Sequence, residues 1–329
     1  MFSKLYEKLI SFIKSCYKEI IFIIFIIFIS FLHLPFVIYK TGGSINLNER
    51  ISGIDSFFNG SYSMNYVSVV KGNIPTLFVS IFMKNWDIKK QSDISIYDYN
   101  TLFKLEQLDL KDSLYKASYV AYQKAGKTIT TKDAHHYITL VSEDSKTNLK
   151  VLDEIKLIDG NKFNELKEFQ EYVKSKNIGD KIIFTLTNGK EKYAYVKDFE
   201  GEKKVGIAIS TNYDYEIDPE INIKTKSSEA GSSGGLMLSL AIYDYINSED
   251  IAKGKNVMGT GTISLDGTIG EIGGVKYKML GAQNDGADIF FVPEKNYEEA
   301  KKVYKDNNFT FSLVMVKTFD DALNYLKNN

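Results

Sequence analysis

Cysteine is almost absent from this chain of 329 residues, which contains only Cys16. A single cysteine cannot form an intramolecular disulfide, so disulfides do not contribute to the fold. The net charge is also small, -1, because 41 Lys and Arg residues nearly balance 42 Asp and Glu residues. This balance excludes a general electrostatic attraction to nucleic acid, and we expect no nucleic-acid partner.

Two short motifs are also missing. The first alanine is Ala117, so the N-terminal region has no A-x-A cleavage site and any apolar segment there should be retained. The nucleotide-binding motif G-x-x-x-x-G-K-[ST] is absent, because Ala121 occupies its first glycine position ahead of Gly126, Lys127 and Thr128. We therefore expect no nucleotide, and nothing in the sequence calls for a metal or another cofactor.

One long uncharged segment is present, residues 20–39, IIFIIFIIFISFLHLPFVIY. About twenty helical residues span the roughly 30 Å core of a bilayer. Lysines are denser before this segment than after it, so the positive-inside rule places the N-terminus in the cytoplasm. The sequence thus predicts a cytoplasmic N-terminus with a single-pass cell-membrane anchor over residues 1–40, and an extracytoplasmic remainder.

The segments that follow the anchor have mixed patterns. Residues 61–70 favour a strand, and residues 76–82 suit either a buried strand or a helix. Apolar residues at helical spacing predict a helix over 108–125 that stops at Gly126. We assign residues 41–134 to the first part of the main domain.

Residues 135–200 have the pattern of a small separate module. Strand patterns YITLV and EIKLI precede a helix pattern, FNELKEFQEYV, and two further strand patterns flank the turn Asn188-Gly189. This order resembles a bacterial, protease-associated PDZ domain, although Leu152 stands where that family usually has glycine. The resemblance implies peptide binding by strand addition to a sheet edge.

Residues 201–329 alternate strand and helix patterns, and together with the preceding segments they predict an α+β fold. Small residues gather at Glu229-Ala-Gly-Ser-Ser-Gly-Gly235, directly before an apolar helix pattern. Ser233 at that helix start has two interpretations: an N-cap, or a nucleophile to which small neighbours give a substrate access. Free N–H groups there could hold an oxyanion.

A second group of glycines runs from Gly259 to Gly274 and leads into a helix that begins VKYK. Lys276 lies on the border of the apolar face of this helix, and we place Lys278 on the far side. Partial burial and the helix dipole would lower the pKa of Lys276, which would let its neutral amine accept a proton. A solvated surface lysine is the alternative.

The strings GSSGGLMLSLAIYDYI and GTGTISLDGTIGEIGGVKYKMLGA resemble the proteolytic domain of Lon-type proteases. The resemblance implies that Ser233 is the nucleophile, that Lys276 is the general base, and that Thr260 supports the lysine. Ser232 and Gly234 stand where the family has proline and alanine, and with Gly231 they would line the oxyanion and substrate approach. Homo-oligomers are expected by analogy.

An anchor, an inserted PDZ-like domain and a Lon-type domain together resemble the PDZ-containing Lon-like proteases of Gram-positive bacteria. The function implied is an ATP-independent, membrane-anchored serine endopeptidase with a Ser-Lys dyad, which cleaves extracytoplasmic peptides or loosely folded proteins through an acyl-enzyme. Two alternatives are an inactive membrane scaffold that binds peptides and a carboxy-terminal processing peptidase. A histidine-based triad with His135 or His136 is a weaker option.

Overall fold

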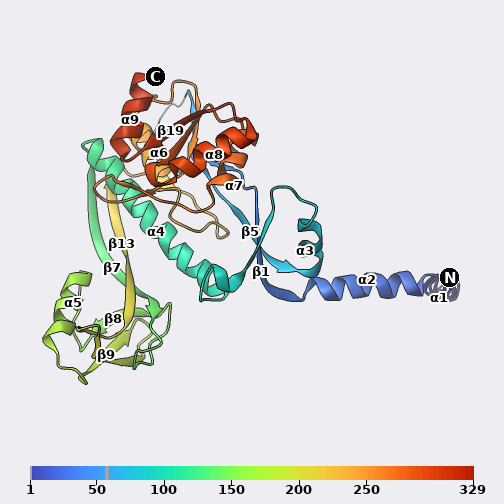
Figure 1. Ribbon diagram of the computed structural model, residues 1–329, viewed down its shortest axis with the longest axis horizontal. Helices are drawn as coiled ribbons and strands as arrows, with labels where there is room; N and C mark the ends of the chain where they lie inside the picture. The colour runs from blue at the N-terminus through green and yellow to red at the C-terminus, as the bar shows by residue number, and fades with distance from the viewer. Residues whose placement is uncertain (1, 56–58) are drawn as a thin grey trace. The chain divides into compact units, whose positions relative to one another are not determined.

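The computed structural model of the protein describes residues 2–55 and 59–329 (Figure 1). The chain divides into two compact units, one made of Met1–Gly42 with Val67–Tyr99 and the other of Gly43–Tyr66 with Asn100–Asn329. The architecture is a mixed α/β fold.

In its described residues, 2–42 and 67–99, the smaller unit is an antiparallel sheet with three helices. Its strand order is β5-β1-β6. Its elements are α1 (Phe2–Ser15), α2 (Tyr17–Ser30), β1 (His33–Lys40), β5 (Ser68–Asn73), α3 (Ile74–Ser80), β6 (Asp87–Lys90) and a 3-10 turn, η1 (Gln91–Asp93). Residues 76–82, for which the sequence left strand and helix open, lie mostly in α3. Asn73 caps this helix by accepting a hydrogen bond from the backbone N–H of Thr76.

The predicted transmembrane helix over residues 20–39 is wrong. Within residues 2–55 and 59–329, no helix combines the length and the apolar character needed to cross a bilayer. Helix α2 ends at Ser30, and its 14 residues extend about 21 Å. The rest of the predicted span forms β1, the central strand, whose Val37 and Ile38 are buried between β5 and β6.

Three further predictions depended on that helix and are also wrong. The membrane anchor over residues 1–40 and the single-pass cell-membrane localisation rested on it, and so did the transmembrane part of the predicted α+β fold. A hydropathy window reads only local sequence, whereas the strand partners of β1 lie at least 28 residues later in the chain, at Ser68–Asn73 and Asp87–Lys90.

The larger unit is built on a five-stranded sheet in the order β19-β18-β15-β4-β2. Only β2 is antiparallel to its neighbour. The strands are β2 (Ser44–Asn46), β4 (Ser61–Asn65), β15 (Asn256–Gly259), β18 (Ile289–Pro293) and β19 (Ser312–Val316), and the helices around them are α6 (Gly235–Asn247), α7 (Val275–Asn284), α8 (Tyr297–Asn307), which follows the 3-10 turn η2 (Glu294–Asn296), and α9 (Phe319–Asn328).

Both faces of this sheet are buried. Along β18, Ile289 and Phe291 contribute to one core with α6 and α9, while Phe290 and Val292 contribute to a second core with α7 and α8. Successive side chains on a strand point to opposite faces, so a strand covered on both sides is apolar throughout. This packing fixes α6 and α7 around β15, and the candidate site lies where these three elements meet.

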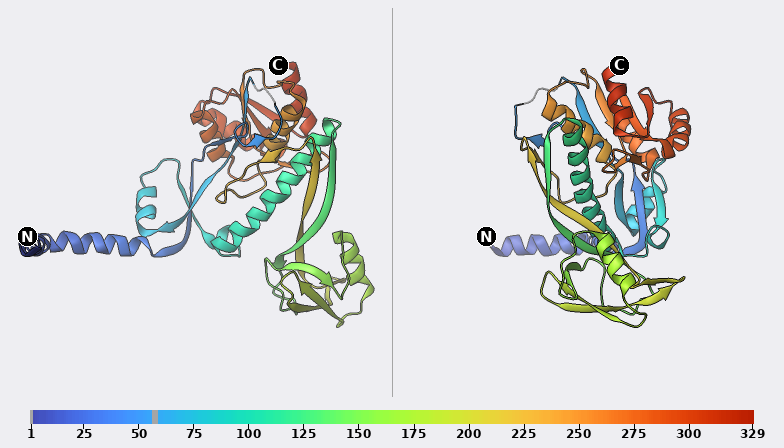
Figure 2. Two further views of the ribbon diagram at one scale, coloured as in Figure 1. Left: turned by 180° about the vertical axis from the view of Figure 1, so that it is seen from behind. Right: turned by 90° about the vertical axis from the view of Figure 1, so that its left-hand side faces the viewer.

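A module with its own core is inserted between α4 (Tyr99–Lys124) and α6. Its sheet has the order β10-β9-β8-β7-β13. The long strands β7 (Thr128–Val141) and β13 (Ile207–Asp218) run side by side into it, as the views in Figures 1 and 2 show. Its other elements are β8 (Glu154–Ile158), α5 (Leu166–Ser175), β9 (Lys181–Leu186), β10 (Glu191–Tyr195), β11 (Lys197–Phe199) and β12 (Glu202–Lys204).

Short strand pairs complete the larger unit. They are β3 (Ile51–Ser52) with β14 (Asn222–Ile223), and β16 (Thr262–Ile263) with β17 (Ile269–Gly270). Helix α4 begins nine residues earlier than the sequence pattern indicated, since it starts at Tyr99. The hairpin predicted at Asn188-Gly189 is present between β9 and β10, with Gly189 at φ 79°.

Candidate active site

The segment between β14 and α6, residues 224–234, is called here the α6 loop. It needs glycine at residue 231, where φ is +93° and an added Cβ would lie 2.9 Å from Oε2 of Glu106. The N–H of Gly231 donates a hydrogen bond to the backbone carbonyl of Glu106 at 2.7 Å. This contact fixes the loop against α4 two residues before Ser233.

Ser233 lies at the end of the α6 loop and meets a lysine from α7. The Nζ atom of Lys278 lies 2.8 Å from Oγ of Ser233 and 3.0 Å from Oγ1 of Thr260. Thr260, which follows β15, also donates its hydroxyl hydrogen to the backbone carbonyl of Ser233 at 3.0 Å. The three residues therefore form a closed hydrogen-bonded group, in which Ser233 is half-buried and Lys278 is only 3% exposed.

Burial sets the protonation of this lysine. Removal from water disfavours the ammonium form and lowers the pKa of Lys278 to about 7, although the nearby Glu106 carboxylate opposes the shift. Near neutral pH a large share of the molecules therefore carries a neutral amine at this position. A neutral amine has a lone pair that can accept the hydroxyl proton of Ser233.

The sequence predicted Lys276 beside Ser233, whereas the lysine that the structure places within hydrogen-bond distance of Ser233 is Lys278. Lys276 is only half-buried, and its Nζ lies 5.5 Å from the ring centre of Tyr277. Lys278 follows Val275 by three residues and so lies on the same face of α7, the face that packs on the sheet. The predicted apolar face of α7 was centred in the wrong direction. A face centred on Val275 and Ala282 includes Lys278.

Two neighbours of Ser233 depart from the Lon-type motif. The backbone carbonyl of Ser232 accepts a hydrogen bond from the hydroxyl of Ser113 on α4, at 3.1 Å. A Cβ at residue 234 would lie 2.5 Å from Sδ of Met64, so the Met64 side chain fills the space that an alanine methyl group would take. Ser232 and Gly234 are thus accommodated by a hydrogen bond and by the Met64 side chain, and Ser233 remains beside Lys278.

Two backbone N–H groups close to Ser233 in the chain are candidate donors to a substrate. In the part of the chain that the structure describes, the backbone N–H groups of Ser233 and Gly234 have no hydrogen-bond acceptor, whereas the N–H of Gly235 donates to the carbonyl of Ser232. Both N–H groups precede the first residue of α6, where the helix dipole is positive. Such groups are available to a negatively charged oxygen.

Contacts that the sequence did not reveal hold the α6 loop in place. The amide of Gln107 donates to the carbonyl of Ser227 at 2.9 Å. Arg50 forms an ion pair with Glu229 at 2.8 Å, and their side chains are only 16% and 12% exposed. No local pattern signals these pairs, because each joins segments more than a hundred residues apart.

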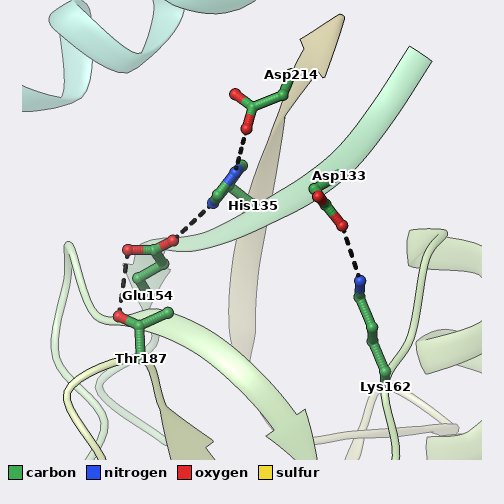
Figure 3. A network of polar contacts seen from close by, with 6 residues as sticks. All are labelled: Asp133, His135, Glu154, Lys162, Thr187 and Asp214. Atoms are coloured by element: carbon green, nitrogen blue, oxygen red, sulfur yellow. Dashed lines mark hydrogen bonds and ion pairs between the residues drawn. The ribbon is translucent and has the colours of Figure 1, made fainter.

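The two histidines outside the N-terminal region lie in the module and not at Ser233. His135 bridges two carboxylates, with Nδ1 at 2.9 Å from Glu154 and Nε2 at 3.1 Å from Asp214 (Figure 3). His136 contacts the hydroxyl of Thr211 and the carbonyl of Phe163. Their partners do not support a histidine-based triad. Across residues 2–55 and 59–329, no group of His, Cys, Asp and Glu side chains is arranged to hold a metal ion.

The candidate site lies in the part of the chain that is similar to known proteins. Residues 200–328 match the family model of the Lon protease (S16) C-terminal proteolytic domain. The Lon protease of Lachnoclostridium phytofermentans is 28% identical over 133 residues, 40% of this chain and 16% of that protein. The peroxisomal Lon protease homolog 2 of Caenorhabditis elegans is 30% identical over 156 residues, 46% of this chain and 20% of that protein. The match thus spans a fifth or less of these relatives, and it supports a serine peptidase.

Among solved structures, the PDZ domain of the SdrC-like protein from Listeria monocytogenes aligns with 24% of this chain and 90% of its own. The aligned residues are 32% identical, and the TM-score is 0.21.

Proposed function

We propose that this protein is a serine endopeptidase in which Ser233 is the nucleophile and Lys278 is the general base. The observation that carries the proposal is the contact of Nζ with Oγ at 2.8 Å, made by a lysine whose burial lowers its pKa to about 7. A buried lysine near neutral pKa beside a serine hydroxyl has the properties that an activated nucleophile requires.

The proton moves between two atoms that are already in contact. In the neutral amine, an N–H of Lys278 donates to Oγ1 of Thr260, and the lone pair faces the hydroxyl of Ser233. As Oγ attacks the scissile carbonyl carbon, its proton passes to Nζ, and the resulting ammonium then protonates the leaving amine. Water repeats the transfer to hydrolyse the acyl-enzyme and restores both groups.

The negative oxygen of the tetrahedral intermediate needs donors. We assign this role to the backbone N–H groups of Ser233 and Gly234 at the start of α6. Gly231 and Ser232 keep the approach open because they place no large side chain before the nucleophile. Removing one such donor from a serine protease typically costs about 10²–10³-fold in kcat.

We also propose that cleavage needs no ATP, because the 329 residues contain no G-x-x-x-x-G-K-[ST] motif. Substrates would then be peptides or loosely folded chains, since unfolding a stable protein requires an energy source.

Incubation of the full chain with an unstructured protein tests the proposal. The intact chain should release peptides without added nucleotide, and Ser233→Ala should release none. Mass spectrometry of the new ends separates an endopeptidase, which cuts at internal positions, from a carboxy-terminal processing peptidase, which trims ends. Equal behaviour of the intact chain and Ser233→Ala would leave only the peptide-binding scaffold.

A second activity, peptide binding by the module, is favoured by one observation. Strand β13 is the edge of the module's sheet, and an apolar pocket lies beside it, under the start of α5. Phe169 and Ile209 line this pocket from the two sides. An extended peptide adding to β13 would run beside these apolar side chains. Titration of the full chain with peptides ending in leucine, against Phe169→Ala, tests it: unchanged binding would refute this location.

A further inference from the structure

A second cavity, called here the α4 cleft, has a volume of about 560 Å³. One wall is a face of α4 that carries Lys104, Lys111 and Leu114, which follow helical spacing. The opposite walls come from the module, through Tyr137 and Leu152, and from residues 225–229 of the α6 loop. Its size is that of ligand sites in proteins, which run to roughly 300–1,000 Å³.

The charge of the α4 cleft is positive. Lys104, Lys111 and Lys226 line it, and no ion pair is found for any of them among the described residues. Its one carboxylate, Glu229, is already paired with Arg50 at 2.8 Å. Leucines and a tyrosine complete the lining, so a suitable occupant combines negative charges with apolar side chains.

The α4 cleft is separate from the catalytic group and yet linked to it. The face of α4 that contacts Gly231 and Ser232, just before the nucleophile, carries Glu106 and Ser113. The α4 cleft uses the different face that carries Lys104 and Lys111. Gln107 lines the α4 cleft and also donates to the carbonyl of Ser227 in the α6 loop. An occupant therefore contacts the loop that leads directly into Ser233.

Leu152 gives the α4 cleft an apolar wall at a backbone cost. Its φ is +72°, a left-handed conformation that is strained for any residue with a Cβ atom. Glycine would adopt it without strain but would present no side chain to the α4 cleft. A strained residue retained at a cavity wall indicates a role for its side chain there.

We propose that the α4 cleft is an exosite that binds an acidic, partly apolar stretch of a polypeptide substrate away from the scissile bond. This deepens the proposed function and rests on it, because a substrate exosite presupposes cleavage of polypeptides. The three unpaired lysines select acidic side chains, and Tyr137, Leu114 and Leu152 contact the apolar ones.

Binding is tested first without cleavage, in the full chain carrying Ser233→Ala. The probe is a fluorescein-labelled peptide of alternating glutamate and leucine, and its counterpart has glutamine in place of glutamate. Fluorescence anisotropy should show about tenfold tighter binding of the glutamate peptide at low salt, with the difference shrinking as salt is added.

Three variants locate the binding. Lys104→Glu with Lys111→Glu should abolish the preference for the glutamate peptide. Leu152→Gly should weaken the binding of both peptides several-fold while the protein remains folded, because glycine tolerates this backbone. The matched control reverses two exposed lysines of α8, Lys302→Glu with Lys305→Glu, and should bind like the parent.

Cleavage by the chain with Ser233 intact gives the second readout. Two quenched fluorescent substrates share one scissile segment, and only one also carries the glutamate and leucine stretch. The longer substrate should have an about tenfold lower KM, and this advantage should vanish in the Lys104→Glu, Lys111→Glu variant.

The outcomes separate the two proposals. Selective binding by Ser233→Ala without any cleavage by the intact chain would refute the protease and leave a peptide-binding cleft. Cleavage with equal KM and equal binding of both peptides would refute the exosite and leave the protease. Binding of an oligothymidylate as tight as that of the glutamate peptide would also overturn the exosite, because the α4 cleft would then attract any polyanion.

Discussion

The Nζ atom of Lys278 and the Oγ atom of Ser233 lie 2.8 Å apart, although 45 positions separate the two residues in the chain. Lys278 is supplied by the second turn of α7, and Ser233 by the loop before α6. The two helices are fixed through opposite faces of the sheet that contains β15, so the geometry of the pair depends on the packing of the whole unit.

Replacing either lysine of the VKYK segment distinguishes their roles. Lys278→Ala should lower kcat/KM by about 10²–10⁴-fold, the range that a positioned general base contributes, while Lys276→Ala should change it little. Initial rates on an unstructured substrate measure both. The assignment fails if Lys276→Ala is the variant that loses activity.

Activity should depend on pH through Lys278. Its neutral form is the base, and burial lowers its pKa to about 7, so kcat/KM should rise as the pH increases through about 7 and level above it. Hydrolysis of one peptide across a range from about pH 5.5 to 9 measures the profile. A profile that rises only near pH 10, the range of an exposed lysine, would contradict the burial argument.

The sequence predicted the helices and strands around Ser233, but it did not predict which lysine of α7 faces Ser233. Glycines, apolar runs and helical spacing placed α6, β15 and α7 within a few residues. Whether Lys276 or Lys278 is buried depends on which face of α7 packs on the sheet. The sequence of the helix alone does not determine that face. Thr260, which the motif places directly after β15, lies in contact with both Ser233 and Lys278.

The error at the N-terminus has another physical cause. An apolar run long enough for a bilayer can equally be divided between a helix and a buried strand, and the division after Ser30 depends on partners at Ser68–Asn73 and Asp87–Lys90. The ion pair of Arg50 with Glu229 was invisible for the same reason, because such pairings follow from the tertiary fold.

The burial that tunes Lys278 should cost stability. An unfolded lysine is charged at neutral pH, and folding transfers it to a site where the charge is disfavoured. Lys278→Met, which keeps an unbranched side chain but removes the amine, should raise the free energy of unfolding by about 1–4 kcal/mol while abolishing activity. Urea denaturation measures it, with Lys276→Met as the control, for which a change within about 0.5 kcal/mol is expected.

The Arg50 and Glu229 pair should hold the α6 loop. Arg50→Met leaves a largely buried carboxylate without its cation, so the free energy of unfolding should fall by about 3 kcal/mol and kcat/KM should fall with it. Arg50→Met with Glu229→Gln should recover much of the loss. Lys124→Met, which breaks an exposed pair with Asp320, should cost less than about 1 kcal/mol. If Arg50→Met and Lys124→Met lowered the free energy of unfolding equally, the proposed role of Arg50 would be refuted.

The module should be more stable in mild acid because of His135. Hydrogen bonds with Glu154 and Asp214 raise the pKa of His135 above its ordinary value (Figure 3). The charged imidazole therefore stabilises the fold fully below about pH 6.5, and this stabilisation is lost as the pH rises through the raised pKa.

Hydrogen exchange of β7 and β13 measures this effect. Protection, corrected for the intrinsic exchange rate, should be greater at about pH 5.5 than at about pH 8, and His135→Gln should remove the difference. A variant that keeps the same pH dependence would assign the effect to other groups.

The pairing of β7 with β13 determines how the module is joined to the chain. Ala134 pairs with Tyr213 and His135 pairs with Asn212, so the chain leaves for the module and returns from it at neighbouring positions. A two-residue turn would close the two strands into a plain hairpin at that point. The module is therefore an insertion whose two ends lie close together. Evolution or a protein engineer can exchange it for another binding domain without changing the path of the backbone that holds Ser233 and Lys278.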